Sequence, residues 1–166
     1  MSAIAMFHLV RNGDVDQLQQ RAAQPVGPVR GGPWSDPYWD FLKEQTRELE
    51  PYDWSGYVLG SEVYYFLESK AAAWDAYCDD RLTDALSQAR GSTVLAFRSA
   101  PAHALAEQID RHRPDGAELQ AFLASPEISN SPEEAVPVEA VADGLQILRT
   151  WLRQVDENHV GLLTIG

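Results

Sequence analysis

The sequence has little with which to build a disulfide or metal scaffold. Its 166 residues include one cysteine, Cys78, and four histidines that lie far apart. A zinc site needs several Cys or His ligands at short spacing, so we predict neither a metal nor a cofactor. Asp75, Asp79 and Asp80 surround Cys78 in the sequence and disfavour its thiolate, so we interpret Cys78 as a core residue on a helix.

Positive charge is also scarce. The chain has 13 Lys and Arg residues against 25 Asp and Glu residues, which gives a formal net charge of -12. A field of this sign repels phosphate backbones and anionic lipid surfaces. We therefore expect no binding to nucleic acid or membrane, and the predicted partner is a basic protein or peptide.

Long apolar runs are missing as well. No stretch approaches the roughly 20 apolar residues of a membrane span. The apolar residues 2–10 form a short run with no basic cluster before it and no small-residue cleavage site after it. We expect a cytoplasmic protein.

Catalytic signature motifs are missing too. The sequence has no Gly-x-Ser-x-Gly elbow, and residues 30–33 lack both the Lys-Ser/Thr ending and the preceding strand of a phosphate-binding loop. No motif in the sequence identifies an enzyme, so we favour a non-enzymatic protein.

What is present is the composition of an ordinary globular protein, with 45% apolar and 23% charged residues. The length fits a single domain over residues 1–166. Three short apolar stretches, residues 4–9, 93–98 and 161–165, predict strands, and apolar residues at helical spacing between them predict helices. We expect Ser35 or Asp36 to cap a helix that Pro51 ends, Asp115 to cap a later short helix, and Arg90-Gly91 to end the helix before the second strand. The predicted fold class is α+β, with a small sheet of about three short strands covered by several helices.

Three segments carry more specific predictions. Residues 55–69 are apolar almost all round and predict a buried central helix, with a pair of short strands as the alternative because of Gly56 and Gly60. Residues 72–89 predict one helix, which would place Asp75 and Asp79 on a shared face where a hard cation could use them, although such a pair is usually just solvated. Residues 25–33 contain six Pro and Gly residues and predict a functional loop.

The candidate acid–base groups are two histidines and two carboxylates. His8 falls in the first strand and His159 in a turn before the last one, and Asp40 or Asp53 would complete a pair. Such a pair would serve a small hydrolase or transferase. Histidines in these settings are more often structural than catalytic.

Aromatic residues are concentrated between Trp34 and Trp74, and most of them must be core. Trp34, Tyr52 and Trp54 instead sit in predicted loops beside helix ends, near acidic residues. Aromatics flanked by acids could line a groove for a cationic or peptide partner. So many aromatic residues compete for a modest core that we also expect a homodimer.

Several short sequence segments carry a family resemblance by their order and spacing, which extend over about half of the chain. They are Met1 to Phe7, Val15 to Leu18, Tyr38 to Leu42, Val94 to Phe97, Ala104 to Ala106, Glu118-Leu119, Asn158 to Val160 and Leu163 to Gly166. Together they resemble the YfbM-like family of uncharacterised bacterial proteins, a domain of unknown function, whereas residues 51–90 depart from its pattern. The resemblance implies a cytoplasmic, single-domain α+β protein, and the family brings no established activity, cofactor or catalytic residue.

These observations leave three functional hypotheses. The leading one is a non-enzymatic binding or interaction protein whose aromatic groove holds a basic partner. The second is a small hydrolase or transferase that uses a histidine and a carboxylate. The third is an acidic immunity or antitoxin-like inhibitor that masks a basic toxin.

Overall fold

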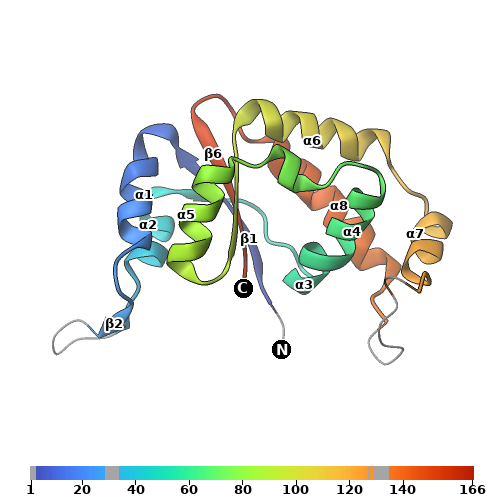
Figure 1. Cartoon of the computed structure of the whole chain (residues 1–166), viewed down its shortest axis with the longest axis horizontal. Helices are drawn as coiled ribbons and strands as arrows, with labels where there is room; N and C mark the ends of the chain where they lie inside the picture. The colour runs from blue at the N-terminus through green and yellow to red at the C-terminus, as the bar shows by residue number, and fades with distance from the viewer. Residues whose placement is uncertain (1–2, 29–33, 127, 129–134) are drawn as a thin grey trace.

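The computed structural model describes residues 3–28, 34–126, 128 and 135–166. Its centre is a four-stranded antiparallel sheet in the order β4-β1-β6-β5 (Figure 1). The strands are β1 (Ala5–Arg11), β4 (Arg47–Glu48), β5 (Thr93–Phe97) and β6 (His159–Ile165), and β2 (Gly27–Pro28) pairs separately with β3 (Trp34–Ser35). The predicted α+β class is confirmed.

Helices cover both faces of the sheet (Figure 1). One face packs against α1 (Val15–Ala22), which follows the short 3-10 turn η1 (Asn12–Asp14), and against α2 (Pro37–Gln45) and α5 (Asp80–Arg90). The other face carries α3 (Gly56–Val58), the π-helical segment η2 (Leu59–Val63), α4 (Tyr64–Ser69), the 3-10 turn η3 (Trp74–Tyr77), α6 (Ser99–Arg111), α7 (Gly116–Leu123) and α8 (Val138–Arg153).

Two cores result because successive side chains of a strand point to opposite faces. Ala5, Phe7 and Leu9 of β1 enter the core beneath α6 and α8, whereas Val10 enters the core beneath α1, α2 and α5. In the larger core the Phe7 ring stacks on the Trp151 ring of α8, with 5.3 Å between centroids. The strand register is therefore fixed by burial on both faces.

The helix that the sequence predicts from Pro37 up to Pro51 is too long. Asp36 does cap α2, and its side chain accepts hydrogen bonds from the backbone N–H groups of Tyr38 and Trp39. The helix ends at Gln45, because Thr46 is extended and its hydroxyl donates to the Leu42 carbonyl at 2.5 Å. The following residues 47–48 pair with β1, which gives the sheet a fourth strand that the sequence pattern did not predict.

The predicted single helix over residues 72–89 is also wrong. The chain forms η3, becomes extended at Cys78 and starts again as α5. Asp79 causes the restart, since its carboxylate caps α5 by accepting from the Leu82 N–H at 3.1 Å. Asp75 and Asp79 consequently do not share a helix face, and Cys78 lies between two helices.

Several other predictions of secondary structure are confirmed. Residues 55–69 form a helical run made of α3, η2 and α4, so the strand-pair alternative is wrong. Residues 93–97 and 159–165 are strands, and Asp115 caps α7 through the Glu118 N–H at 2.8 Å. α5 ends at Gly91 in a left-handed conformation, as the predicted Arg90-Gly91 stop requires.

Candidate functional site

His8 is buried on the face of the sheet that packs against α1, α2 and α5. Its Nε2 lies 3.9 Å from Glu48 Oε2, and its Nδ1 has no hydrogen-bond partner among the described residues. Burial lowers the pKa of His8, with the Glu48 charge opposing the effect. A buried neutral imidazole with no route to a substrate is poorly placed for acid–base chemistry.

His159 is the first residue of β6, not part of the turn before it as predicted, and its Nδ1 lies 2.7 Å from Asp156 Oδ1. The hydrogen bond with His159, followed by the one from the Asn158 N–H, holds the pKa of Asp156 below its usual range. This contact joins residues three apart and fastens the turn before the strand.

Neither histidine meets its proposed carboxylate. Asp40 accepts a hydrogen bond from Ser35 Oγ at 2.9 Å, and the described ion pairs of His8 and His159 are with Glu48 and Asp156. The structure therefore assembles no pair of His8 or His159 with Asp40 or Asp53 in the part of the chain it describes.

Tyr52, Asp53 and Trp54 line one hollow of about 380 Å³ beside α8, together with Glu50 and Asp143. We call it the acidic hollow. Its aromatic residues are fixed by hydrogen bonds: Tyr52 Oη donates to the Ala140 carbonyl at 2.6 Å and Trp54 Nε1 donates to Asp143 Oδ2 at 2.9 Å. Tyr52 is buried by its contact with α8, and this burial raises its pKa.

Trp34 is separated from Tyr52 and Trp54. It lies on β3, its residue is 75% exposed, and it does not line the acidic hollow. The predicted groove of three aromatic residues is thus divided between two places. Of the predicted functional loop, residues 29–33 lie outside the described part of the chain, and the preceding residues 27–28 form β2.

A larger hollow of about 610 Å³ opens where α3, η2 and α4 meet η3 and the ends of β5 and β6. We call it the tyrosine hollow and define it by Tyr57, Ser61, Tyr64, Tyr65, Trp74 and Asp75. Tyr57 is 56% exposed and Tyr65 is 47% exposed, so both rings are accessible to a ligand from solvent.

The helical run positions these side chains because residues 57, 61, 64 and 65 fall on one helix face. Within it, η2 is a π-helical segment, a distortion that occurs frequently at functional sites. Ser61 Oγ donates to the Tyr57 carbonyl at 2.6 Å in this segment. Gly60 lines the hollow without a side chain. A Cβ there would make only an ordinary contact with the Ile165 side chain, at 3.6 Å.

Asp75 supplies the negative charge of the tyrosine hollow. Tyr64 Oη donates to Asp75 Oδ2 at 2.7 Å, and this hydrogen bond is the main reason that the pKa of Tyr64 rises to about 12. The Tyr64 ring also contacts the rings of Trp74 and Tyr65, with centroid distances of 5.1 Å and 5.5 Å. The hydrogen bond and the two ring contacts therefore fix the position of the Tyr64 side chain in the wall of the hollow.

The apolar pattern of residues 55–69 predicts core residues, so it gives no indication of this site. The available signal was the residue type: three of the four residues at these helical positions are tyrosines, which carry a polar end that prefers water. Leucines at the same spacing would have indicated core only.

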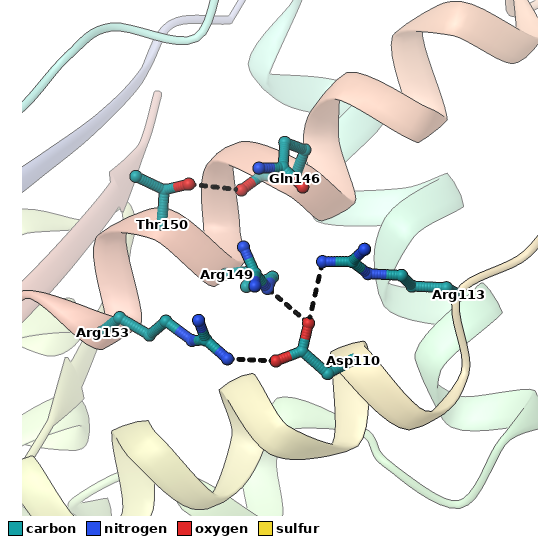
Figure 2. A network of polar contacts seen from close by, with 6 residues as sticks. All are labelled: Asp110, Arg113, Gln146, Arg149, Thr150 and Arg153. Carbon is teal, nitrogen blue, oxygen red and sulfur yellow. Dashed lines mark hydrogen bonds and ion pairs between the residues drawn. The ribbon is translucent and has the colours of Figure 1, made fainter.

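Positive charge gathers at a different place. Asp110 near the end of α6 accepts hydrogen bonds from Arg113, Arg149 and Arg153 (Figure 2). Desolvation alone would raise the pKa of Asp110, but the Arg149 hydrogen bond and the three guanidinium charges lower it. We call Arg113, Arg149 and Arg153 the arginine cluster.

Other kinds of site find little support. In the ranges that the structure describes, no group of three or more His, Cys, Asp or Glu side chains is arranged to hold a metal ion. Burial, followed by the Asp75 charge, raises the pKa of the Cys78 thiol to about 12, which disfavours a nucleophilic thiolate. No helix in the described ranges is long and apolar enough to cross a membrane.

Comparisons with models of protein families, with curated proteins and with solved structures give no match to this chain. Function is therefore inferred from the hollows and charges of the described residues.

Proposed function

We propose that the protein is a non-enzymatic binding protein that holds a lysine or arginine side chain of a basic partner in the tyrosine hollow. The observation that carries the proposal is the grouping of Tyr57, Tyr64, Tyr65 and Trp74 with the Asp75 carboxylate around a hollow of about 610 Å³. Aromatic faces attract cations through their quadrupoles, and this is how aromatic cages recognise ammonium groups.

The carboxylate adds a directed contact. Tyr64 donates to Oδ2 of Asp75, so the lone pairs of Oδ1 have no protein donor among the described residues. Hydrogen bonds between a cationic donor and a carboxylate are roughly twice as strong as neutral ones. A guanidinium or ammonium group between the aromatic rings and Asp75 would obtain both interactions.

The charge of the whole chain favours the same class of partner. A net charge of -12 attracts basic molecules over distances longer than any contact and speeds their association. The acidic hollow, with Glu50, Asp53 and Asp143, contributes to this field on a second part of the surface.

The mode of binding is insertion of a side chain, because the neighbouring edge of the sheet is closed. On the outer side of β5, the Ser87 hydroxyl bonds both the N–H and the carbonyl of Val94. The Ala96 N–H donates to Thr83 Oγ1, and the Ala96 carbonyl accepts from the Asp79 N–H. An edge whose backbone groups are already satisfied cannot add a peptide as a further strand.

Several predictions accompany this proposal. An immunity or antitoxin-like inhibitor is a special case of it, in which the basic partner is a toxin. Membership of the YfbM-like family, a cytoplasmic location and a homodimer stay predictions, as does the hydrolase or transferase alternative.

The test is binding of a fluorescein-labelled octapeptide of alternating Arg and Gly, measured by fluorescence anisotropy. We expect Tyr57→Ala and Tyr65→Ala each to weaken binding about fivefold, since one cation–π contact contributes about 1 kcal/mol. Trp34→Ala is the matched control, because it removes an exposed aromatic residue away from the hollow and should change affinity less than about twofold.

Two results would contradict the proposal. One is the absence of saturable binding by the native protein. The other is an equal effect of Trp34→Ala and Tyr57→Ala on affinity, whether a loss or no change, because the hollow would then contribute no more than an exposed aromatic residue elsewhere on the surface.

A further inference from the structure

The arginine cluster borders a smaller hollow of about 200 Å³ between the end of α6 and the exposed face of α8. We call it the arginine notch. Its polar wall consists of Arg113, Arg149 and Gln146, and its apolar wall includes Ile109, Pro114 and Leu145. Arg153 belongs to the same ion-pair network but does not line the notch.

The network contains more positive than negative charge. Three guanidinium groups share the single carboxylate of Asp110, so the four groups together carry two more positive charges than negative ones. This excess stands out in a chain with a net charge of -12. A local concentration of positive charge attracts anions, even on a protein whose net charge is negative.

Donor capacity is also left over. A guanidinium has five N–H donors, and the bonds to Asp110 use only Nε of Arg149 and Nη2 of Arg113. The Arg149 side chain is 17% exposed and is held in place by Asp110, so it is positioned before any ligand arrives. In Figure 2, Arg113 and Arg149 approach Asp110 from different sides, and Gln146 lies on the helix one turn from Arg149.

We propose that the arginine notch binds the carboxylate or phosphate group of a small ligand whose apolar body lies against Ile109, Pro114 and Leu145. Planar guanidinium groups match both kinds of anion with paired hydrogen bonds. The apolar wall supplies burial for the rest of the ligand. This site is separate from the tyrosine hollow, and the inference does not depend on the proposed function.

The test is a titration of the full-length protein with benzoate, followed by amide chemical shifts in NMR spectra. Benzoate carries a carboxylate on an apolar ring, and inorganic phosphate is the second probe because it has no apolar part. We expect saturable shifts around the notch with benzoate, and binding of phosphate that is at least threefold weaker.

Two variants separate the notch from the general charge of the cluster. Arg113→Gln should weaken benzoate binding about tenfold, since a hydrogen bond to a charged group is lost. Arg153→Gln removes the same charge from the same network outside the notch, and its effect should stay below about twofold. The Arg113 side chain is 64% exposed, so Arg113→Gln should not disturb folding, which circular dichroism can verify.

Three results would overturn the inference. They are no saturable shift with benzoate, an equal loss of affinity in Arg113→Gln and Arg153→Gln, and phosphate binding as tight as benzoate binding. The last result would show that the wall of Ile109, Pro114 and Leu145 contributes nothing to binding, which contradicts the proposed apolar body of the ligand. Tyr57→Ala should leave benzoate binding unchanged, which keeps this test independent of the tyrosine hollow.

Discussion

Replacement of Gly161 by alanine tests the packing on which the whole arrangement depends. Gly161 lies in β6 opposite Leu9 of β1 and Phe97 of β5. A Cβ at this position would lie 2.5 Å from Cζ of Phe7 and 2.7 Å from Cγ2 of Val155. Carbon atoms in contact are normally 3.5–4.0 Å apart, so the Phe7 ring would have to move by roughly 1 Å.

The Phe7 ring has little room to move, because it stacks between the rings of Trp151 and Phe97, at centroid distances of 5.3 Å and 6.3 Å. Overpacking of a filled core costs about 1–3 kcal/mol, and we expect Gly161→Ala to lower the free energy of unfolding by this amount in urea titrations.

Gly116→Ala is the matched control, since a Cβ at Gly116 would meet no atom within 4 Å. Its effect should stay within about 0.5 kcal/mol. A Gly161→Ala protein as stable as the native one would refute the described packing of the Phe7 ring against Gly161.

Three further predictions concern stability and reactivity. Asp36→Ala should lower the free energy of unfolding by about 2 kcal/mol and Asp115→Ala by about 1 kcal/mol, because both lose a helix cap but only Asp36 also pairs with the largely buried Arg90; equal losses in urea titrations would contradict the Asp36–Arg90 contribution. Burial lowers the pKa of His8 below 6.5, so the unfolded chain binds this proton more readily and the associated stability, present above pH 6.5, is lost as the pH falls below it. His8→Leu should therefore lose less stability than the native protein between about pH 7 and pH 5, and identical urea midpoint shifts would argue against a neutral His8. The pKa of Cys78 near 12 predicts that its thiol reacts with iodoacetamide at least tenfold more slowly than glutathione at about pH 8, and an equal rate in the folded protein would show that the thiol is not suppressed.

Local signals in the sequence predicted much of the fold. The caps at Asp36 and Asp115, the stop at Gly91 and the apolar stripes of α1 and α8 each act within a few residues, so they can be recognised without knowledge of the tertiary structure. The α+β class follows from the order of these elements.

The failures have physical reasons. Two-residue β4 exists only because it pairs with β1, which lies far away in the sequence. Helical spacing continues across Asp79, but the side chain of this residue starts a new helix by capping it, and spacing alone cannot show which effect prevails.

In the candidate sites, too, residues that are neighbours in the sequence could be predicted together, whereas residues joined only by tertiary packing could not. Tyr52, Asp53 and Trp54 share one hollow because they are adjacent in the sequence, whereas Trp34 belongs to a separate hairpin. The arginine notch could not be predicted, because Arg113 and Arg149 are joined only by the packing of α6 against α8.

The most direct test of the central claim is to locate the bound side chain of the Arg-Gly octapeptide by intermolecular nuclear Overhauser effects. We expect contacts from the arginine side-chain protons to the rings of Tyr57 and Tyr65 in the tyrosine hollow. Contacts to the Trp54 ring of the acidic hollow or to Trp34, without any to Tyr57 or Tyr65, would contradict the proposed site.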